Sequence, residues 1–549
     1  MSQPVLPLQN FLHWENTAPN DVFLRQPIAG HWHSFTWAQA GQQCRSMAAA
    51  LQGMGLQPGT HVALLSKNCA HWLMADVAIM MAGCVSIPIY PTLSSAGIKP
   101  ILEHSGAQAI ICGKLDDYAE QQLGFPPHMP VIGIDAYGTR GQQQWEALVQ
   151  QHAPLAQVHP WQPADCMSII YTSGTTGLPK GVMHSCQAFA ASTEALINGM
   201  GLGRRPQLFS FLPLTHIAER VGIQMVGICN GGTIAFSESL TSFAADLESV
   251  QPTFFFAVPR LWAKFQEGVL LKMPQKKLDL LLRVPIVNGI IRKKITHKLG
   301  LSRATHIFSG AAPLSPAIIA WFQKLGILII QGYGMTEDCI YGHFEYPGNR
   351  CLGSVGKPLP GLKTKFTAVG ELCVKSNGLM MGYYKDPVLT AASFDGDGYL
   401  LTGDLAAYNH EGYLFITGRS KDQFKTDKGK YVAPSPIEMA LAANNLVEQV
   451  CVVGMGIPQP LALVTLALTS SQLTQAEIVA SLSATLVQVN MHLEAHEKVE
   501  KIVVMQESWT IANGLITPTM KIKRNEVEKI HQQFYPSWFS RQGMVVWEG

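Results

Sequence analysis

The chain has 549 residues, which allows two to four domains of about 150 residues each and a large buried core. Apolar residues make up 47% of the chain, charged residues make up 14%, and the formal net charge is +2. This balance excludes a disordered or collagen-like chain and argues against a nucleic-acid-binding protein.

Cysteine usage and apolar runs indicate the compartment. The chain has 11 cysteines, scattered along its length, and no two of them form a Cys-x-x-Cys pair. This pattern favours neither a zinc ribbon nor a redox motif, and it predicts a reduced, cytoplasmic protein. Residues 1–16 predict no secretion signal, and the longest apolar stretch, residues 77–90, is too short to span a bilayer.

Short β-branched runs alternate with helical patterns through the first 400 residues. Helices are predicted at residues 35–54 and 70–82, and a glutamine-rich segment, residues 141–153, is interpreted as a solvated helix. Strands are predicted at residues 61–68, 84–90 and 107–113 and from residues 233, 253, 304 and 327. Such alternation indicates α/β layers with mostly parallel sheets.

From about Gly353 the pattern changes to short strands and glycine-rich turns, which predicts a small β-rich subdomain. It would close a large N-terminal domain, residues 1–420. A small α+β domain is expected at residues 421–549, with strands near 450–455, 461–468 and 501–505 and a helix near 475–495. The expected fold class is therefore α/β, with layered subdomains followed by a small C-terminal domain.

The strongest local signal is SIIYTSGTTGLPKGV, residues 168–182, where an apolar strand enters a polar, glycine-rich loop. Glycines let backbone N–H groups approach an anion, and hydroxyls and a lysine add donors and charge. The spacing is not that of a Walker A motif. We predict a phosphate-binding loop rather than a polar turn, formed by Thr172, Ser173, Gly174, Thr175, Thr176, Gly177, Lys180 and Gly181.

The motif YTSGTTGLPKG resembles the signature of the adenylate-forming superfamily, which includes acyl-CoA synthetases, peptide-synthetase adenylation domains and luciferases. The resemblance runs from about residue 20 to 525, and three motifs are most similar to long-chain fatty acyl-CoA synthetases: FLPLTHIAER, KTDKGKYVAP and NGLITPTMKIKR. The matching segments, in the order of that superfamily, are residues 168–182, 211–220, 310–315, 331–337, 402–404, 418–434 and 513–524.

The resemblance implies an enzyme that converts a long-chain fatty acid to an acyl-adenylate with ATP and Mg²⁺ and then transfers the acyl group to CoA. It also implies a small C-terminal domain that rotates between the two steps. The loop from Thr172 to Lys180 would hold the phosphates, with Thr172 near the metal. Glu337 would be the Mg²⁺ carboxylate, and Thr336 would contact the α-phosphate.

The resemblance also implies contacts to the nucleoside. Asp404 would accept hydrogen bonds from both ribose hydroxyls, and Arg419 would approach the same sugar. The adenine ring would be bordered by Gly310, Gln331, Gly332 and Tyr333, of which Tyr333 could stack on it.

Four further roles follow from the resemblance. His216 would position the acyl carboxylate, although a lone histidine in an apolar stretch is usually a core residue. Lys521 would bridge the carboxylate and the α-phosphate, with Lys523 as the rival assignment. Lys421 would be the hinge between the domains. The CoA step would involve Lys425, Gly429 and Tyr431, and a solvated charge run is the alternative for the two lysines at 421 and 425.

The acyl pocket cannot be located by spacing; residues 217–228 and 254–262 could form its walls or simply pack in the core. Residues 260–303 contain eleven Lys or Arg against two acids, a net charge of +9, which leaves −7 on the rest of the chain. This basic amphipathic stretch suits an anionic membrane surface on the inner face of the membrane. A solvated helix that attracts the CoA phosphates is the alternative.

Two other functions remain open. An acyl-AMP ligase would load the phosphopantetheine of a carrier protein, but such enzymes carry an extra insertion, and none is evident near residues 340–420. A non-catalytic nucleotide-binding relative would typically lose the carboxylate or the C-terminal lysine, and both Glu337 and Lys521 are present.

Overall fold

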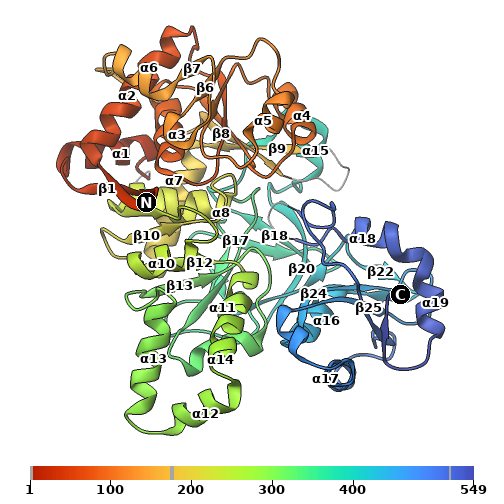
Figure 1. Ribbon diagram of the computed structural model, residues 1–549. Coiled ribbons are helices and arrows are strands. Elements are labelled where there is room, and N and C mark those ends of the chain that lie inside the picture. Colours follow the sequence, from red (N-terminus) through yellow and green to blue (C-terminus); the bar gives the residue numbers. More distant parts are fainter. Residues whose placement is uncertain (1–3, 173–178, 518–520) are drawn as a thin grey trace.

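The computed structural model describes residues 4–172, 179–517 and 521–549 (Figure 1). Five predicted loop residues, Ser173, Gly174, Thr175, Thr176 and Gly177, lie outside the described residues. The α/β fold class is confirmed, with a large N-terminal domain followed by a smaller C-terminal domain. The exact boundary at residue 421 stays a prediction.

An eight-stranded sheet, ordered β19-β9-β8-β4-β3-β5-β6-β7, lies in the N-terminal part of the chain. Its strands are β3 (His61–Leu65), β4 (Val85–Ile89), β5 (Ala109–Cys112), β6 (Val131–Gly133), β7 (Gln143–Gln144), β8 (Cys166–Thr172), β9 (Lys180–Ser185) and β19 (Gly382–Tyr383). The strands from β8 to β7 are parallel. The central ones, β4, β3, β5 and β6, are mostly apolar, as expected of strands covered on both faces. The helices packed with this sheet are α2 (Trp37–Gly53), α3 (Ala70–Met81), α4 (Ser95–Ser105), α5 (Tyr118–Gln121) and α6 (Trp145–Gln151).

A nine-stranded sheet follows, ordered β16-β15-β14-β13-β12-β10-β11-β1-β2. Its strands are β1 (Val22–Ile28), β2 (His31–Thr36), β10 (Gln207–Ser210), β11 (Thr233–Phe236), β12 (Phe254–Ala257), β13 (His306–Ser309), β14 (Ile329–Tyr333), β15 (His343–Phe344) and β16 (Lys357–Pro358). Its helices are α1 (Pro7–Thr17), α7 (Cys186–Met200), α8 (Ile217–Glu219), a π-helical turn (Arg220–Met225), α9 (Val226–Asn230), α10 (Phe243–Val250), α11 (Pro259–Lys272), α12 (Gln275–Arg283), α13 (Val287–Lys298) and α14 (Pro316–Lys324).

The predicted β-rich subdomain is a four-stranded antiparallel sheet of β17 (Lys363–Phe366), β18 (Glu371–Lys375), β20 (Leu400–Tyr408) and β21 (Leu414–Arg419), with α15 (Pro387–Ala392) nearby in the chain. The C-terminal domain contains the sheet β24 (Val447–Val453), β25 (Leu461–Leu466), β26 (Lys501–Val504) and β27 (Val545–Trp547). It also holds the hairpin β22 (Phe424–Lys425) and β23 (Tyr431–Val432) and the helices α16 (Pro434–Leu441), α17 (Gln475–Asn490), α18 (Arg524–His531) and α19 (Tyr535–Ser540). In Figure 1 these blue elements lie beside the β-rich subdomain.

The predicted strands and helices of the large domain are present, with two corrections. The helix expected from residue 35 begins only at Trp37, because β2 continues to Thr36, whose hydroxyl caps the helix by accepting from the Gln39 N–H. The glutamine-rich segment does form α6, but it is not solvated all round: Trp145 and Leu148 are buried. None of the described helices is long and apolar enough to cross a membrane.

Candidate functional site

His216 lies just before α8, on the connection from β10. Its Nδ1 accepts a hydrogen bond from the Ala218 N–H at 3.2 Å, so the neutral ring carries its proton on Nε2. Burial, together with the positive charge of Lys521, lowers the pKa of His216 to about 4. The ring is therefore a neutral hydrogen-bond donor at pH 7 and not a cation.

A buried polar cluster holds the chain on both sides of His216. Glu219 Oε1 accepts from the Ser210 hydroxyl at 2.8 Å and from the Phe211 N–H at 3.0 Å. Asn68 donates to the Leu212 carbonyl at 2.6 Å and accepts from the Leu214 N–H at 3.1 Å. Burial raises the pKa of Glu219 to about 8.

Arg220 anchors the same segment to the eight-stranded sheet. Its guanidinium donates to both carboxylate oxygens of Asp76 on α3, at 2.9 and 2.8 Å, and to the Ser168 hydroxyl of β8 at 3.0 Å. The side chains of Arg220 and Asp76 are both 0% exposed. The guanidinium lies 5.4 Å from the ring centre of Trp72 and 5.3 Å from that of Phe189.

Asp404 joins the β-rich subdomain to the end of β14. It lies opposite Arg419 in the β20–β21 ladder and accepts from the Arg419 Nε at 2.8 Å. Its other carboxylate oxygen accepts from the Tyr333 hydroxyl at 2.6 Å. Burial and the carboxylate of Asp404 raise the pKa of Tyr333 well above its usual value. The predicted adenine and ribose residues Tyr333, Asp404 and Arg419 are thus in direct contact.

The other predicted adenine residues surround this group. A Cβ at Gly332 would lie 2.4 Å from the ring of Phe344, and one at Gly310 would lie 3.2 Å from Phe256, so both positions are closely packed. The side-chain amide of Gln331 donates to the Ser354 carbonyl at 2.9 Å and accepts from the Leu314 N–H at 3.4 Å. Both the nitrogen and the oxygen of the Gln331 amide are therefore bonded to protein groups. Through Leu314, Gln331 supports the loop after β13.

Glu337 lies four residues beyond β14, next to Thr336, and both side chains are partly exposed. The Tyr383 hydroxyl donates to Glu337 Oε1 at 2.8 Å, and the Lys180 ammonium lies 5.7 Å from the centre of the Tyr383 ring. Burial and the charge of Glu337 raise the pKa of Tyr383. Tyr383 therefore brings the predicted metal carboxylate and the lysine of the phosphate loop to one place.

Thr172 and Lys180 face each other across the β8–β9 hairpin and flank the loop residues that lie outside the description. The described residues contain no cluster of three or more His, Cys, Asp or Glu that could hold a metal alone. The hydroxyl of Thr172 and the carboxylate of Glu337 are hard oxygen donors, and Mg²⁺ commonly combines one protein carboxylate with substrate phosphates. This donor set fits Mg²⁺ bound together with a nucleotide.

Lys521 reaches this group from the C-terminal domain. Burial and the nearby charge of Arg419 lower the pKa of Lys521. The negative charges of Asp404 and Glu337 act in the opposite direction. Its backbone N–H donates to the Thr517 hydroxyl at 3.0 Å within its own domain. The rival, Lys523, immediately precedes α18, and its N–H donates to the Leu515 carbonyl at 2.8 Å.

The hinge and CoA-step residues are on the outside of the same domain. Lys425 and Tyr431 are paired in the β22–β23 hairpin, both are exposed, and the Lys425 ammonium lies 5.9 Å from the ring centre of Tyr431. Gly429 turns between them with φ of +78°, a conformation that favours glycine. Lys421 is exposed at the turn after β21.

A small cavity of about 50 Å³ opens beside His216. Its apolar wall combines both segments suggested for the acyl pocket, residues 217–228 and 254–262. A Cβ added at Gly222 would meet nothing within 4 Å, so that side of the cavity has room. The apolar side chains lining it include Leu196, Phe254, Phe256, Phe308, Ile340 and Phe344.

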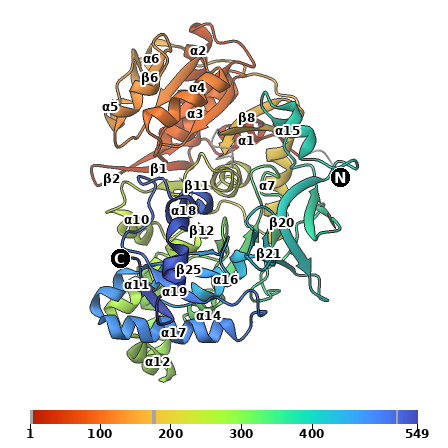
Figure 2. The same ribbon diagram turned by 90° about the vertical axis from the view of Figure 1, so that its right-hand side faces the viewer.

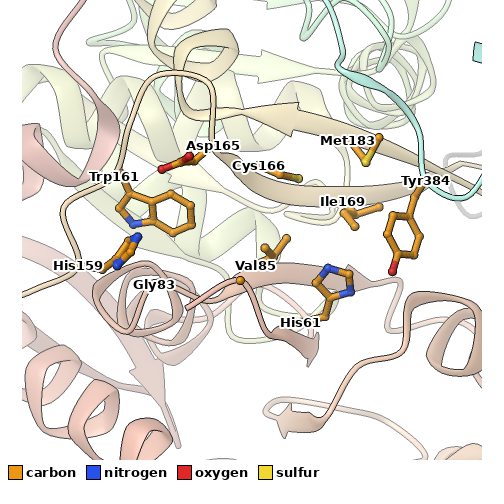
Figure 3. A pocket seen from close by; sticks show the side chains of 11 residues that line it. His61, Gly83, Val85, His159, Trp161, Asp165, Cys166, Ile169, Met183 and Tyr384 are labelled. Carbon is orange, nitrogen blue, oxygen red and sulfur yellow. The ribbon is translucent and has the colours of Figure 1, made fainter. Parts of the chain in front are cut away.

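A wider cavity, about 460 Å³, lies elsewhere (Figure 3). His61 and Val85 line it from the starts of β3 and β4, and Trp161 and Tyr384 line its two ends. None of the catalytic candidates, His216, Thr336, Glu337 and Lys521, lines this cavity.

Sequence reasoning missed several residues of the site. Glu219 and Arg220 lie within FLPLTHIAER, but no role is assigned to them from the sequence. An adjacent acid and base in an apolar run is itself a signal of a functional or buried polar pair. Tyr383 and Asp76 carry no local signal, because their partners lie 46 and 144 residues away in the chain.

Comparison with known proteins agrees with this geometry. Among curated relatives, the long-chain-fatty-acid–CoA ligase FadD15 of Mycobacterium tuberculosis is 28% identical over 93% of each chain. The human long-chain-fatty-acid–CoA ligase 1 is 29% identical over 90% of this chain and 80% of its own.

Solved structures share the fold. The anthranilate CoA ligase AuaEII, in complex with anthranoyl-AMP, superposes with a TM-score of 0.80 at 20% identity, over 97% of this chain and 98% of its own. The A domain of a carboxylic acid reductase from Segniliparus rugosus, in complex with AMP and a carboxylic acid, also gives 0.80 at 20% identity, over 98% and 94%.

Sequence models for whole families match both domains. The model described as AMP-binding enzyme covers residues 11–384, and that described as AMP-binding enzyme C-terminal domain covers residues 421–534. The chain therefore belongs to the AMP-binding family of adenylate-forming enzymes.

Proposed function

We propose that the protein is an AMP-forming long-chain fatty acid–CoA ligase. It activates the fatty acid with ATP to an acyl-adenylate and diphosphate, then passes the acyl group to CoA and releases AMP. The observation that carries the proposal is the meeting of Lys521 from one domain with His216, Glu337 and Asp404 of the other. The names of the relatives, which match over 93% and 80% of their own length, support the substrate class.

In the first step the fatty acid carboxylate attacks the α-phosphorus, and negative charge builds up on both partners. Lys521 bridges the carboxylate and the α-phosphate and stabilises that charge. His216 orients the carboxylate by donating its Nε2–H, a role that its neutral state supports. Because its pKa is lowered, His216 is uncharged at pH 7. It therefore holds the carboxylate without adding a second positive charge beside Lys521.

The triphosphate is held by the loop from Thr172 to Lys180, and Thr336 contacts the α-phosphate. Glu337 and Thr172 would hold Mg²⁺, which would supply positive charge to neutralise the phosphates. Tyr383 fixes the Glu337 carboxylate through its hydroxyl, 2.8 Å away, so that the carboxylate is oriented before the metal arrives.

The nucleoside is held by the group around Asp404. Asp404 accepts from the ribose hydroxyls, with Arg419 beside the sugar, and Tyr333 stacks on adenine between the backbone of Gly310 and Gly332. The hydrogen bonds from Tyr333 and Arg419 to Asp404 support this role, because they fix the orientation of the carboxylate.

In the second step the C-terminal domain rotates about Lys421, which withdraws Lys521 and brings the Lys425–Tyr431 hairpin to the site. The pantetheine thiol of CoA then attacks the acyl carbonyl and AMP leaves. The exposure of Lys425, Gly429 and Tyr431 supports this alternation, because the hairpin is free to contact a ligand.

The acyl chain enters the cavity beside His216. The cavity of about 50 Å³ is too small for a long chain, so the aromatic side chains of Phe254 and Phe308, whose ring centres are 5.0 Å apart, must move when the chain binds. Gly222 leaves room on the opposite side.

The test supplies ATP, Mg²⁺ and CoA with a ladder of fatty acids and measures acyl-CoA, AMP and diphosphate. We expect thioester formation with kcat/KM highest for long chains. Gly222→Leu should lower kcat/KM for long chains about tenfold or more and spare short ones, whereas Gly396→Leu, at an open surface turn, changes neither. Adenylate without CoA thioester, but with transfer to a carrier protein, would instead identify an acyl-AMP ligase; ATP binding without any adenylate would identify a non-catalytic relative.

A further inference from the structure

Helices α11, α12 and α13 form a projection from the nine-stranded sheet. In both views α12 lies at one extremity of the molecule, far from the eight-stranded sheet (Figures 1 and 2). The inner faces of these helices pack onto the core: Leu278 is 1% exposed, and Leu282, Ile291 and Ile295 are partly buried against the same cluster. The projection is therefore an ordered part of the large domain.

The end of this projection leaves four large aliphatic side chains in water. We call Leu280, Val284, Ile286 and Ile290 the apolar tip; their exposed fractions are 63%, 41%, 83% and 61%. Leu280 belongs to α12 and Ile290 to α13, while Val284 and Ile286 lie in the short connection between these helices. Because α12 and α13 contact each other, the four side chains gather around this connection.

Ile286 adds a second peculiarity. Its φ is +70°, a conformation that is rare for any residue with a Cβ and a true outlier for a β-branched one. It is also the most exposed residue of the tip. Both the backbone strain and the exposure of the side chain are unfavourable in water, and nothing in the described chain covers the side chain. Contact with an apolar phase would remove the cost of the exposure.

Positive charge surrounds the tip. Residues 260–303 carry +9, while the rest of the chain carries −7. Within the described parts of the chain, nine of the eleven cations of this segment form no ion pair, the exceptions being Arg260 and Lys298. The nine include the six exposed cations between residues 272 and 294: Lys272, Lys276, Lys277, Arg283, Lys293 and Lys294. Of the two acids, Asp279 already faces Lys324 at 4.0 Å and accepts from Gln275 at 2.9 Å. The projection is the positive pole of the molecule.

We infer that the projection docks on an anionic lipid bilayer, with the apolar tip in the headgroup–acyl boundary and the six free cations on lipid phosphates. Amphipathic elements with lysines and arginines beside aliphatic side chains bind in this way. Nucleic acid would use the charge but leave the four aliphatic side chains in water, so the lipid is the better match. This surface is independent of the adenylation chemistry.

The placement also connects the bilayer to the candidate acyl pocket. Phe254 and Phe256 of β12 line the cavity beside His216, and β12 leads through Pro259 directly into α11 of the projection. If the proposed function holds, docking brings the pocket wall close to the phase in which long-chain fatty acids dissolve. Docking itself does not depend on that function.

The test is co-sedimentation of the full chain with vesicles of phosphatidylcholine alone or of equal parts phosphatidylcholine and phosphatidylglycerol. Wild type should bind the anionic vesicles, weaken with salt, and bind the neutral ones poorly. The triple variant Lys276→Gln, Lys277→Gln, Arg283→Gln should lose about 100-fold in affinity. The triple variant Leu280→Ser, Ile286→Ser, Ile290→Ser should lose at least about tenfold.

Matched controls remove the same groups elsewhere. Lys363→Gln, Lys498→Gln and Lys529→Gln remove three exposed cations, and Leu240→Ser, Val369→Ser and Val388→Ser remove three exposed aliphatic side chains. Both control variants should bind as wild type does. All variants should unfold at the wild-type temperature, which separates lost docking from lost folding.

A spectroscopic probe reports insertion directly. Ile286→Trp should shift its fluorescence to the blue on anionic vesicles, whereas Val388→Trp, at a site 79% exposed in the wild type, should not. Unchanged binding by both triple variants, the one that removes charge and the one that changes the apolar tip, would overturn the proposal. So would loss of binding by the charge variant alone with no blue shift, which would describe an electrostatic surface for an acidic protein.

Discussion

The wall of the site that carries His216 is fixed inside the large domain, whereas Lys521 approaches the same site from the C-terminal domain. Around His216, Asp76 and Arg220 are paired at 0% exposure, and Glu219 takes several donors on one oxygen. Lys521 belongs to the C-terminal domain, where its backbone N–H donates to the Thr517 hydroxyl at 3.0 Å.

This difference between the two sides explains how one site can serve both adenylate formation and thioester formation. Groups needed throughout are preorganised by buried bonds, which hold their geometry without reorganisation. A group needed in one step is delivered by the C-terminal domain. One link between the two domains is the ion pair of Arg260 and Glu448, 2.6 Å long and partly exposed.

Breaking the fixed side should have the largest effect. Asp76→Asn leaves the fully buried Arg220 without its counter-charge, so we expect a loss of about 3–5 kcal/mol in the free energy of unfolding, measured by denaturant titration. The control is Asp116→Asn, whose partner is the surface Lys67; it should cost less than about 1 kcal/mol. Equal losses would show that the wall is not specially fixed.

The fixed side should also set a pH dependence. Burial raises the pKa of Glu219 from 4.5 to about 8, so the folded state retains a proton that the unfolded state releases. Stability is therefore full below pH 4.5 and falls as the pH rises towards 8, by up to about 5 kcal/mol. Glu219→Gln should flatten this part of the pH–stability curve, while the exposed Glu103→Gln leaves it unchanged. A curve that keeps its slope in Glu219→Gln would refute this account.

The nucleoside group, also in the large domain, should behave as fixed machinery in both steps. Asp404→Ala should raise the KM for ATP, because charged hydrogen bonds to the ribose contribute about 1.5–3 kcal/mol each. Tyr333→Phe, which removes only the 2.6 Å hydrogen bond to Asp404, should have a smaller effect. An unchanged KM for ATP in Asp404→Ala would exclude the ribose role.

Much of this fixed side could be predicted from the sequence, since strands such as β3, β4 and β5 are short apolar runs and the motifs carry their residues locally. Pairings over long separations could not. The contact of Tyr333 with Asp404 spans 71 residues and that of Arg220 with Asp76 spans 144. These depend on how subdomains pack, for which local pattern contains no information.

Edge elements were also beyond the sequence pattern. β1 and β2 join the nine-stranded sheet beside β11, and β27 completes the C-terminal sheet from the end of the chain. The strand β2, HWHSFT, is polar and largely exposed, so it lacks the apolar alternation that identifies a strand. The π-helical turn after His216 likewise has no sequence signature.

The smallest expected effect concerns the link between the domains. Glu448→Gln removes the charge opposite Arg260, and a partly exposed ion pair contributes about 0–1 kcal/mol. The ratio of the two half-reaction rates should therefore change by less than about fivefold, in favour of the thioester step. Glu248→Gln, which breaks ion pairs within the large domain, should leave the ratio unchanged.

The central claim, that Lys521 serves one step and is then withdrawn, is tested most directly by separating the half-reactions of Lys521→Ala. Adenylate formation from fatty acid and ATP is measured in one assay, and conversion of supplied acyl-adenylate and CoA to thioester in another. We expect the first step to slow by about 10²–10³ and the second to stay near the wild-type rate. Selective loss in Lys523→Ala would move the role to that lysine, and equal slowing of both steps by Lys521→Ala would contradict the account.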